Sequence, residues 1–348
     1  MRIRRSLPIL IGVLLVAGAV ALVVVLRKHA PPEPARLLPG ADGFVYVDFK
    51  WMRRVNLLGN LPQVFHAPEY EQFVEATGID AERDLDEAAL AIHYPQNMTG
   101  ARAEDLRFSE VLVGHFQAER LSAYLRKAAS TVDSYRSTQI YSIPLENRIL
   151  RVAVLAVNTV AASNAPDPQV IRGIIDRSRK LASPFGGPAV LRQYYKEVPL
   201  ASLAWAVIKA NPSLEASGAG LLSWSYLFPK PAVVVASARY LGSVHLKAAA
   251  FTESSEDAAE VAKKVDIFLT LFRTAQGTVS ASGTDPDVKA LFDSLKAEQQ
   301  KNRVVLTAVA TVGFVHKLLS EAPLTAPTAP LQPSEARPVV PATKGGKR

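Results

Sequence analysis

The chain has 348 residues, of which 49% are hydrophobic, and it carries a formal net charge of +8 and no cysteine. The absence of cysteine excludes disulfide bonds, thiolate nucleophiles and thiolate metal sites. The positive charge lies mainly at the two ends, because residues 1–35 carry +4 and residues 321–348 carry +2, which leaves +2 for residues 36–320. A nucleic-acid-binding protein concentrates basic residues on its folded domain, so this distribution argues against a nucleic-acid partner.

The first segment of the chain, Leu7–Leu26, is an uncharged run of twenty residues, with three arginines before it and Arg27 and Lys28 after it. Twenty apolar residues at helical rise match the hydrocarbon thickness of a bilayer. The flanking charges favour an N-terminus in the cytoplasm. Residues 1–28 are therefore predicted to be a signal anchor that crosses the inner (cytoplasmic) membrane once, with the body on the periplasmic, extracytoplasmic side.

Two other interpretations of this run stay open. A cleaved signal peptide would use Ala19–Ala21 as its small-residue site, although Leu22–Leu26 continues the hydrocarbon beyond it. A buried core helix would be shorter and would not carry cations at both ends.

The remaining sequence predicts an α+β fold with mixed or antiparallel sheets and amphipathic helices on one face. A Pro-rich linker at 29–36 precedes two α+β units, 37–183 and 184–320, and a disordered, Pro-rich basic tail at 321–348. Strands are expected at 44–49, 88–94, 109–116, 140–143, 149–162, 202–208, 232–238, 244–251 and 304–312. Helices are expected at 68–77, 121–132, 170–181, 258–272 and 288–295, with a short one after 312.

The two units have a similar order of elements, which suggests an internal duplication. The segment 156–161 (Ala-Val-Asn-Thr-Val-Ala) also matches 308–313 (Ala-Val-Ala-Thr-Val-Gly) at an offset of 152. Because the match is short and rich in Ala and Val, chance alone can produce it.

Residues capable of catalysis are dispersed. His93 and His115 lie near the ends of two neighbouring predicted strands and are expected to approach one another, but no third ligand stands at metal spacing. Counted from Asp80, the alternating acids of 80–86 lack the Gly and Glu of a calcium loop, so a solvated acidic turn is expected there. Neither a phosphate loop nor a serine-nucleophile motif occurs, so no catalytic residue, cofactor or metal is predicted.

The most unusual segment is 221–228, in which Trp224, Tyr226 and Phe228 alternate with serine and leucine between glycine-rich and proline-rich flanks. Two interpretations are open. A strand with its aromatic face in the core is one. An exposed aromatic loop that binds lipid or a partner protein is the other, and it makes these three residues the candidate binding site.

The residues of 37–48, Leu-Leu-Pro-Gly-Ala-Asp-Gly-Phe-Val-Tyr-Val-Asp, resemble the opening of an uncharacterised bacterial family of anchored, extracytoplasmic proteins. Members of that family begin after the anchor with a Leu-Pro-x-Asp turn and a Tyr/Val-rich strand. Val160–Asn164, followed by a helix, resembles the same family. The resemblance implies the location and an α+β fold, and no activity.

These observations favour a non-enzymatic role for the body of the chain. We expect a membrane-anchored, extracytoplasmic protein that binds or scaffolds a protein partner. The alternative is an extracytoplasmic hydrolase whose site is assembled from dispersed residues such as Asp48, His93 and His115.

Overall fold

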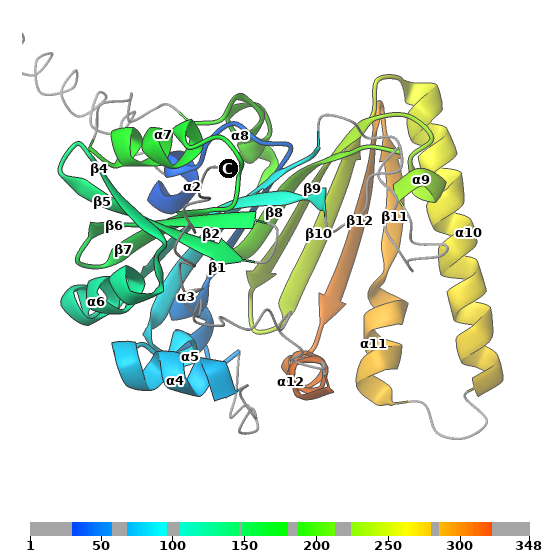
Figure 1. Cartoon of the computed structure of the whole chain (residues 1–348). Helices are drawn as coiled ribbons and strands as arrows, with labels where there is room; N and C mark the ends of the chain where they lie inside the picture. Colours follow the sequence, from blue (N-terminus) through cyan, green and yellow to red (C-terminus); the bar gives the residue numbers. More distant parts are fainter. Residues whose placement is uncertain are drawn as a thin grey trace, which may run out of the picture.

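The computed structural model describes residues 30–57, 68–95, 105–145, 148–179, 187–212, 224–279 and 285–321. One twelve-stranded antiparallel sheet, in the order β11-β12-β10-β9-β8-β1-β2-β3-β7-β6-β5-β4, runs through the whole of this part (Figure 1). The strands are β1 (Gly43–Asp48), β2 (Leu85–His93), β3 (Arg107–Gly114), β4 (Thr131–Tyr135), β5 (Thr138–Leu145), β6 (Arg148–Ala156), β7 (Thr159–Ser163), β8 (Ser202–Ala210), β9 (Ala232–Tyr240), β10 (Val244–Phe251), β11 (Lys296–Gln300) and β12 (Arg303–Ala310).

Helices cover both faces of this sheet. They are α2 (Glu33–Leu37), α3 (Phe49–Arg54), α4 (Pro68–Thr77), α5 (Ala81–Asp84), α6 (Ala118–Ala128), α7 (Gln169–Ser178), α8 (Ala189–Tyr194), α9 (Trp224–Leu227), α10 (Ser255–Val279), α11 (Pro286–Ser294) and α12 (Val312–Glu321). On β6, Val152 belongs to the hydrophobic cluster beneath α6, whereas its neighbour Ala153 belongs to the cluster beneath α7. Successive side chains of a strand point to opposite faces, so the expected one-sided covering by helices is wrong.

The expected membrane-spanning helix is the main correction to the predicted fold. Among the helices that the structure describes, none combines the length and the apolar character needed to cross a membrane. The longest, α10, has 25 residues, but charged residues such as Lys263, Lys264 and Asp266 interrupt its apolar sequence. The single-pass, signal-anchor topology is therefore not part of this fold. The run on which it rested, Leu7–Leu26, lies outside the described residues, and the extracytoplasmic location stays a prediction.

The segment before the first strand is not the extended spacer that its prolines predict. α2 begins after Pro32, and proline is well tolerated in the first turn of a helix. Ala35 is fully buried and Leu38 is 1% exposed, and both belong to the cluster beneath α7. Residues 33–38 therefore form part of the core.

The two predicted units share one sheet and repeat one topology. In each half three consecutive strands pair antiparallel and are followed by one or more helices, and the last strand returns to pair with the third, as β7 pairs with β3 and β12 with β10. The halves join where β1 pairs with β8. The match of 156–161 with 308–313 does not relate equivalent positions, because it aligns the β6–β7 turn with the end of β12.

The strands that the sequence does not reveal, β4 and β11, form the two edges of the sheet. Their residues are largely exposed and polar, Thr-Val-Asp-Ser-Tyr and Lys-Ala-Glu-Gln-Gln. Polar, charged edge strands discourage pairing with other chains, and they lack the hydrophobic alternation by which strands are recognised.

Candidate functional site

The residues proposed for a hydrolase do not come together. His93 pairs with Arg107 at one end of the β2–β3 ladder, whereas His115 follows Gly114 at the other end, which pairs with Leu85. Eight residues of extended strand separate the two ends by roughly 25 Å. The prediction that these histidines approach one another is therefore wrong.

Asp48 and His93 have structural roles instead. Asp48 caps α3, because its Oδ1 accepts a hydrogen bond of 2.7 Å from Trp51 N. His93 Nε2 lies 3.0 Å from Ser109 Oγ, which lies 2.8 Å from Ser163 Oγ. Desolvation by burial lowers the pKa of His93, which favours its neutral form. Both serines are buried, at 0% and 3% exposed, so this hydrogen-bonded chain is closed to a substrate.

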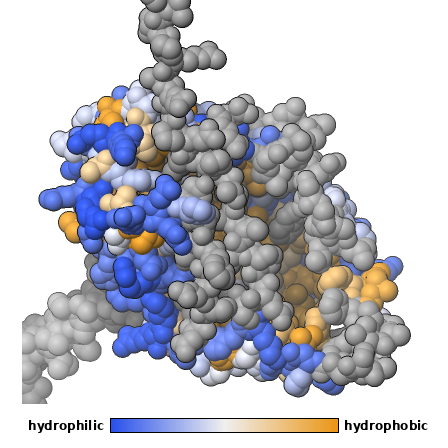
Figure 2. Space-filling view, turned by 60° about the horizontal axis from the view of Figure 1, so that its bottom comes forward, coloured by the Kyte–Doolittle hydropathy of each residue, from blue (hydrophilic) through white to orange (hydrophobic). Residues whose placement is uncertain are grey.

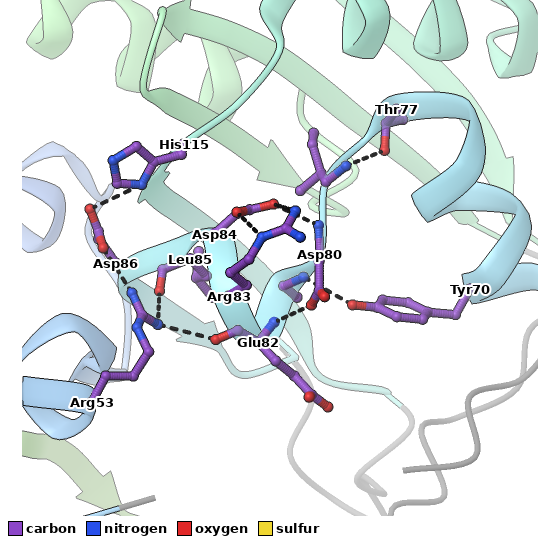
Figure 3. A network of polar contacts seen from close by, with 12 residues as sticks. Arg53, Tyr70, Thr77, Asp80, Glu82, Arg83, Asp84, Leu85, Asp86 and His115 are labelled. Carbon is purple, nitrogen blue, oxygen red and sulfur yellow. Dashed lines mark hydrogen bonds and ion pairs between the residues drawn. The ribbon is translucent and has the colours of Figure 1, made fainter. Parts of the chain in front are cut away.

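The acidic segment 80–86 leads into β2 as predicted, but it forms the short helix α5 and the start of the strand (Figure 3). The side chains of Asp84 and Asp86 are only 13% exposed, so the expected solvated turn is wrong for these two residues. Asp80 caps α5 by accepting a hydrogen bond of 3.0 Å from Glu82 N. Asp84 accepts hydrogen bonds from the guanidinium of Arg83 and from Asp80 N, and these bonds hold the pKa of its carboxyl below the usual value. The carboxylates of Asp80 and Asp84 therefore stabilise the local structure of this segment.

Asp86 completes this network by connecting three elements. Its carboxylate lies 2.9 Å from the guanidinium of Arg53 on α3 and 3.7 Å from Nδ1 of His115 (Figure 3). Arg53 also donates to the carbonyl oxygens of Glu82 and Leu85, at 3.2 and 2.7 Å. Within the described residues no group of three or more acidic or histidine side chains could hold a metal ion.

The aromatic segment lies in and after the short helix α9, not in a strand. Phe228 is 5% exposed and packs in a cluster with residues of α10, β8, β9, β10 and β12. Tyr226 is half-buried, with Lys264 Nζ 5.7 Å from the centre of its ring. The side chain of Trp224 and residues 213–223 lie outside what the structure describes. The aromatic binding site stays a prediction for Trp224 and Tyr226, while Phe228 lies in the core.

A groove with an apolar floor crosses the second half of the sheet and has a volume of about 480 Å³. Hydrophobic surface gathers in a hollow when the molecule is viewed from below (Figure 2). The side chains that line it are aliphatic: Ala204, Ala206, Ala236, Ala238, Ala248 and Ala308 on the floor, with Val45, Leu246, Leu306, Leu291 and Leu295 around them. The neighbouring Trp205, Ser237 and Lys247 also line it, but alternation directs their side chains to the opposite face.

The depth of the groove follows from the pairing of the strands. Val45, Ala206, Ala236, Ala248 and Leu306 form one row in register across β1, β8, β9, β10 and β12. Five strands at the usual spacing make this row roughly 19 Å long. Three alanines at its centre carry only a Cβ atom, so the floor is lowest in the middle.

Packed helices close the groove at both ends of the strands. Beyond one end lies the cluster in which α9 and α10 cover Ala210, Ala232 and Ala250. Beyond the other end, residues of α3, α11 and α12 pack around Leu203 and Val244. The groove is thus a strip of sheet between two covered regions.

The row continues past Val45 through Leu90 to Glu110 on β3. Glu110 forms no hydrogen bond or ion pair with any described residue, and burial alone raises the pKa of its carboxyl. A carboxylate in this position destabilises the fold, because charge is poorly solvated on an apolar face.

Replacing this carboxyl, Glu110→Gln, should therefore stabilise the protein at neutral pH. The buried carboxyl titrates above its unfolded value, so the wild type loses stability as pH rises from about 4.5 through the raised pKa. We expect a gain of about 1–3 kcal/mol at pH 7 and almost none at pH 3.5, measured by thermal unfolding. Glu119→Gln, at an exposed position on α6, is the matched control and should leave the midpoint unchanged. An equal gain at both pH values would contradict the explanation.

The sequence contains a signal for this groove. Ala204-Trp205-Ala206 and Ala236-Ser237-Ala238 alternate a small residue with another type on two neighbouring strands. Such alternation indicates a sheet face with little side-chain volume, but it does not show whether a helix covers that face.

Comparisons with known proteins identify no family for this chain. No protein-family model matches it, and no curated protein sequence matches it. Among solved structures, crystal forms IV, III and I of the Treponema protein TP0453 match with TM-scores of 0.38, 0.40 and 0.40 and identities of 10%, 9% and 9%. The matches cover 82–84% of this chain and 96–98% of TP0453. At such TM-scores the similarity supports no conclusion about function, and the resemblance to an uncharacterised bacterial family is compatible with it but not confirmed.

Proposed function

We propose that this protein binds a single acyl chain in the groove over β8, β9, β10 and β12. The observation that supports this proposal is the lining, in which the side chains on the groove's face of the sheet are aliphatic over a volume of about 480 Å³. Ligand pockets typically measure about 300–1,000 Å³ and are mainly apolar. An acyl chain is a specific occupant for the binding role that the sequence favours.

The dimensions of the groove suit one acyl chain. The hydrocarbon core of a bilayer is about 30 Å thick and contains two layers of chains, so one chain extends about 15 Å. The row of residues from Val45 to Leu306 spans roughly 19 Å across five strands.

The chemistry of the floor also favours hydrocarbon over peptide. The five strands beneath the groove pair with neighbours on both sides, so their backbone N–H and C=O groups are engaged in the sheet. A peptide laid in this groove would find no hydrogen-bond partners along the floor, whereas an acyl chain requires none.

The test is to fill the groove and measure the binding of a neutral apolar probe. Purified full-length protein should enhance the fluorescence of N-phenyl-1-naphthylamine, and palmitate should displace the probe. Ala206→Phe and Ala236→Phe place a ring on the floor and should each weaken binding at least tenfold, because the ring occupies the space of the chain.

Ala156→Phe is the matched control, because Ala156 is exposed at the end of β6, outside the groove. It should bind the probe as the wild type does. Equal binding by Ala206→Phe, Ala236→Phe and wild type would contradict the proposal, and so would a wild type that fails to bind.

A further inference from the structure

A second cleft, of about 510 Å³, lies where β3 and β6 begin and β5 ends. Three arginines line it, Arg107, Arg148 and Arg151, together with Asn164 from the segment after β7. Among the described residues that line it, none is acidic. Because residues 36–320 carry a net charge of only +2, this concentration of cations is local and does not reflect a basic surface in general.

The guanidinium groups are held in place by backbone carbonyl oxygens. Arg151 Nη1 donates to Ala165 O at 2.8 Å, and Arg148 Nη1 donates to Leu106 O at 3.3 Å. Arg107 Nη1 donates to the carbonyls of Asp105 and Leu106, at 2.9 and 3.2 Å. Carbonyl oxygens carry no full charge, so these bonds fix the side chains of Arg148 and Arg151 without neutralising their charge.

Arg148 and Arg151 retain most of their hydrogen-bonding capacity. A guanidinium has five N–H donors, and each of these two side chains uses one nitrogen in the bonds above. Neither forms an ion pair with a carboxylate in the described part of the chain. Clustered charge without a counter-ion is costly, so a bound anion would stabilise the arrangement.

Asn164 adds a neutral donor to the same cleft. Its Oδ1 accepts a hydrogen bond of 2.6 Å from Phe108 N, and its backbone N donates to Phe108 O at 3.0 Å. The amide is therefore fixed in orientation, and its Nδ2 group has no hydrogen-bond partner among the described residues.

We propose that this cleft binds the phosphate group of a phosphate-bearing molecule through Arg148, Arg151 and Asn164, beside Arg107. Guanidinium groups pair with phosphate oxygens through two parallel hydrogen bonds, and phosphate has enough oxygens to engage more than one guanidinium. The source is a soluble phosphate compound or an anionic lipid headgroup at a membrane surface.

This site is independent of the acyl-chain groove. Arg151 lies in register with Ser163 and Ser109, on the face of the sheet that includes Val111 and Ala161, whereas the groove lies on the opposite face. The cleft is lined from β3, β5 and β6, and none of these strands lines the groove, so the two sites are distinct.

Inorganic phosphate is the first probe. At constant ionic strength it should raise the thermal midpoint of the full-length protein above that in chloride, because a ligand that binds only the folded state stabilises it. In the variant R148Q/R151Q the apparent affinity for phosphate should fall at least tenfold. Arg126→Gln is the matched control, since Arg126 lies on α6 and bonds to Gln139, outside the cleft.

A second arm distinguishes the sources. If vesicles of phosphatidylglycerol compete with phosphate and bind R148Q/R151Q more weakly than wild type, the ligand is a headgroup. If phosphate binds and the vesicles do not compete, the ligand is soluble. A phosphate effect equal to that of chloride, or unchanged in R148Q/R151Q, overturns the proposal.

Should R148Q/R151Q fail to fold, the wild type provides the test. Titration with phosphate should shift the Nε–H resonances of a few arginines in ¹H–¹⁵N spectra. The absence of any arginine shift overturns the proposal as well.

Discussion

Replacing Trp205 with alanine should lower the free energy of unfolding by about 3–5 kcal/mol, among the largest effects of any single substitution in this chain. Trp205 is 3% exposed on β8 and stacks on Tyr46 of β1, with ring centres 5.5 Å apart. The rings of Trp205 and Tyr195 form a T-shaped pair, with ring centres 5.2 Å apart. Because β1 and β8 join the two halves of the sheet, we expect the thermal midpoint to drop by roughly 10 °C in calorimetry.

Two control variants separate packing from polar effects. Trp205→Phe keeps most of the ring and removes Nε1–H, which has no partner among the described residues, so it should cost far less than Trp205→Ala. Trp51→Ala removes a tryptophan that is 40% exposed on α3 and should change stability little. If Trp205→Ala melts like wild type, the contact between β1 and β8 does not depend on this side chain.

Replacing Phe228 with alanine should also cost about 3–5 kcal/mol, because its ring is buried against α10 and the sheet. Tyr226→Ala should cost less, since the exposed contact of its ring with Lys264 is worth about 0.5–1 kcal/mol. Thermal unfolding of both variants measures this difference.

The outcome decides between the two interpretations of the aromatic segment. If Phe228→Ala is strongly destabilised and Tyr226→Ala is not, the core ends at Phe228 and Tyr226 remains available for a partner. Equal, small effects for both variants would place the whole segment outside the core.

Several elements are readable from the sequence because their signals are local. The hydrophobic period of 258–272 predicts the buried face of α10, where Ala258, Val261 and Leu269 are at most 5% exposed. Ser254 caps this helix as its position predicts, because its Oγ accepts a hydrogen bond of 3.1 Å from Asp257 N. The side chain of Asp257 pairs with Lys230 at 2.7 Å, a contact across 27 residues that no local pattern indicates.

The errors of prediction arise where position in the fold outweighs local pattern. β11 has no hydrophobic alternation and is a strand because β12 offers a free edge. The prolines of 30–36 suggest an extended linker. α2 nevertheless packs in the core, because Ala35, Leu37 and Leu38 are buried in the hydrophobic cluster beneath α7. His93 and His115 lie on neighbouring strands, and only the antiparallel pairing places them at opposite ends.

The sequence by itself determined the α+β class, most strands and the amphipathic helices, because these depend on the period of hydrophobic residues within about twenty positions. Only the tertiary structure decided where the groove and the arginine cleft form. The groove exists because alanines from four strands align in register on a strip of the sheet between the regions that α9, α10, α3, α11 and α12 cover. The arginine cleft brings together Arg107 and Arg151, which lie on different strands. Both arrangements depend on strand order and register, which are set by long-range pairing and are not encoded in any single segment.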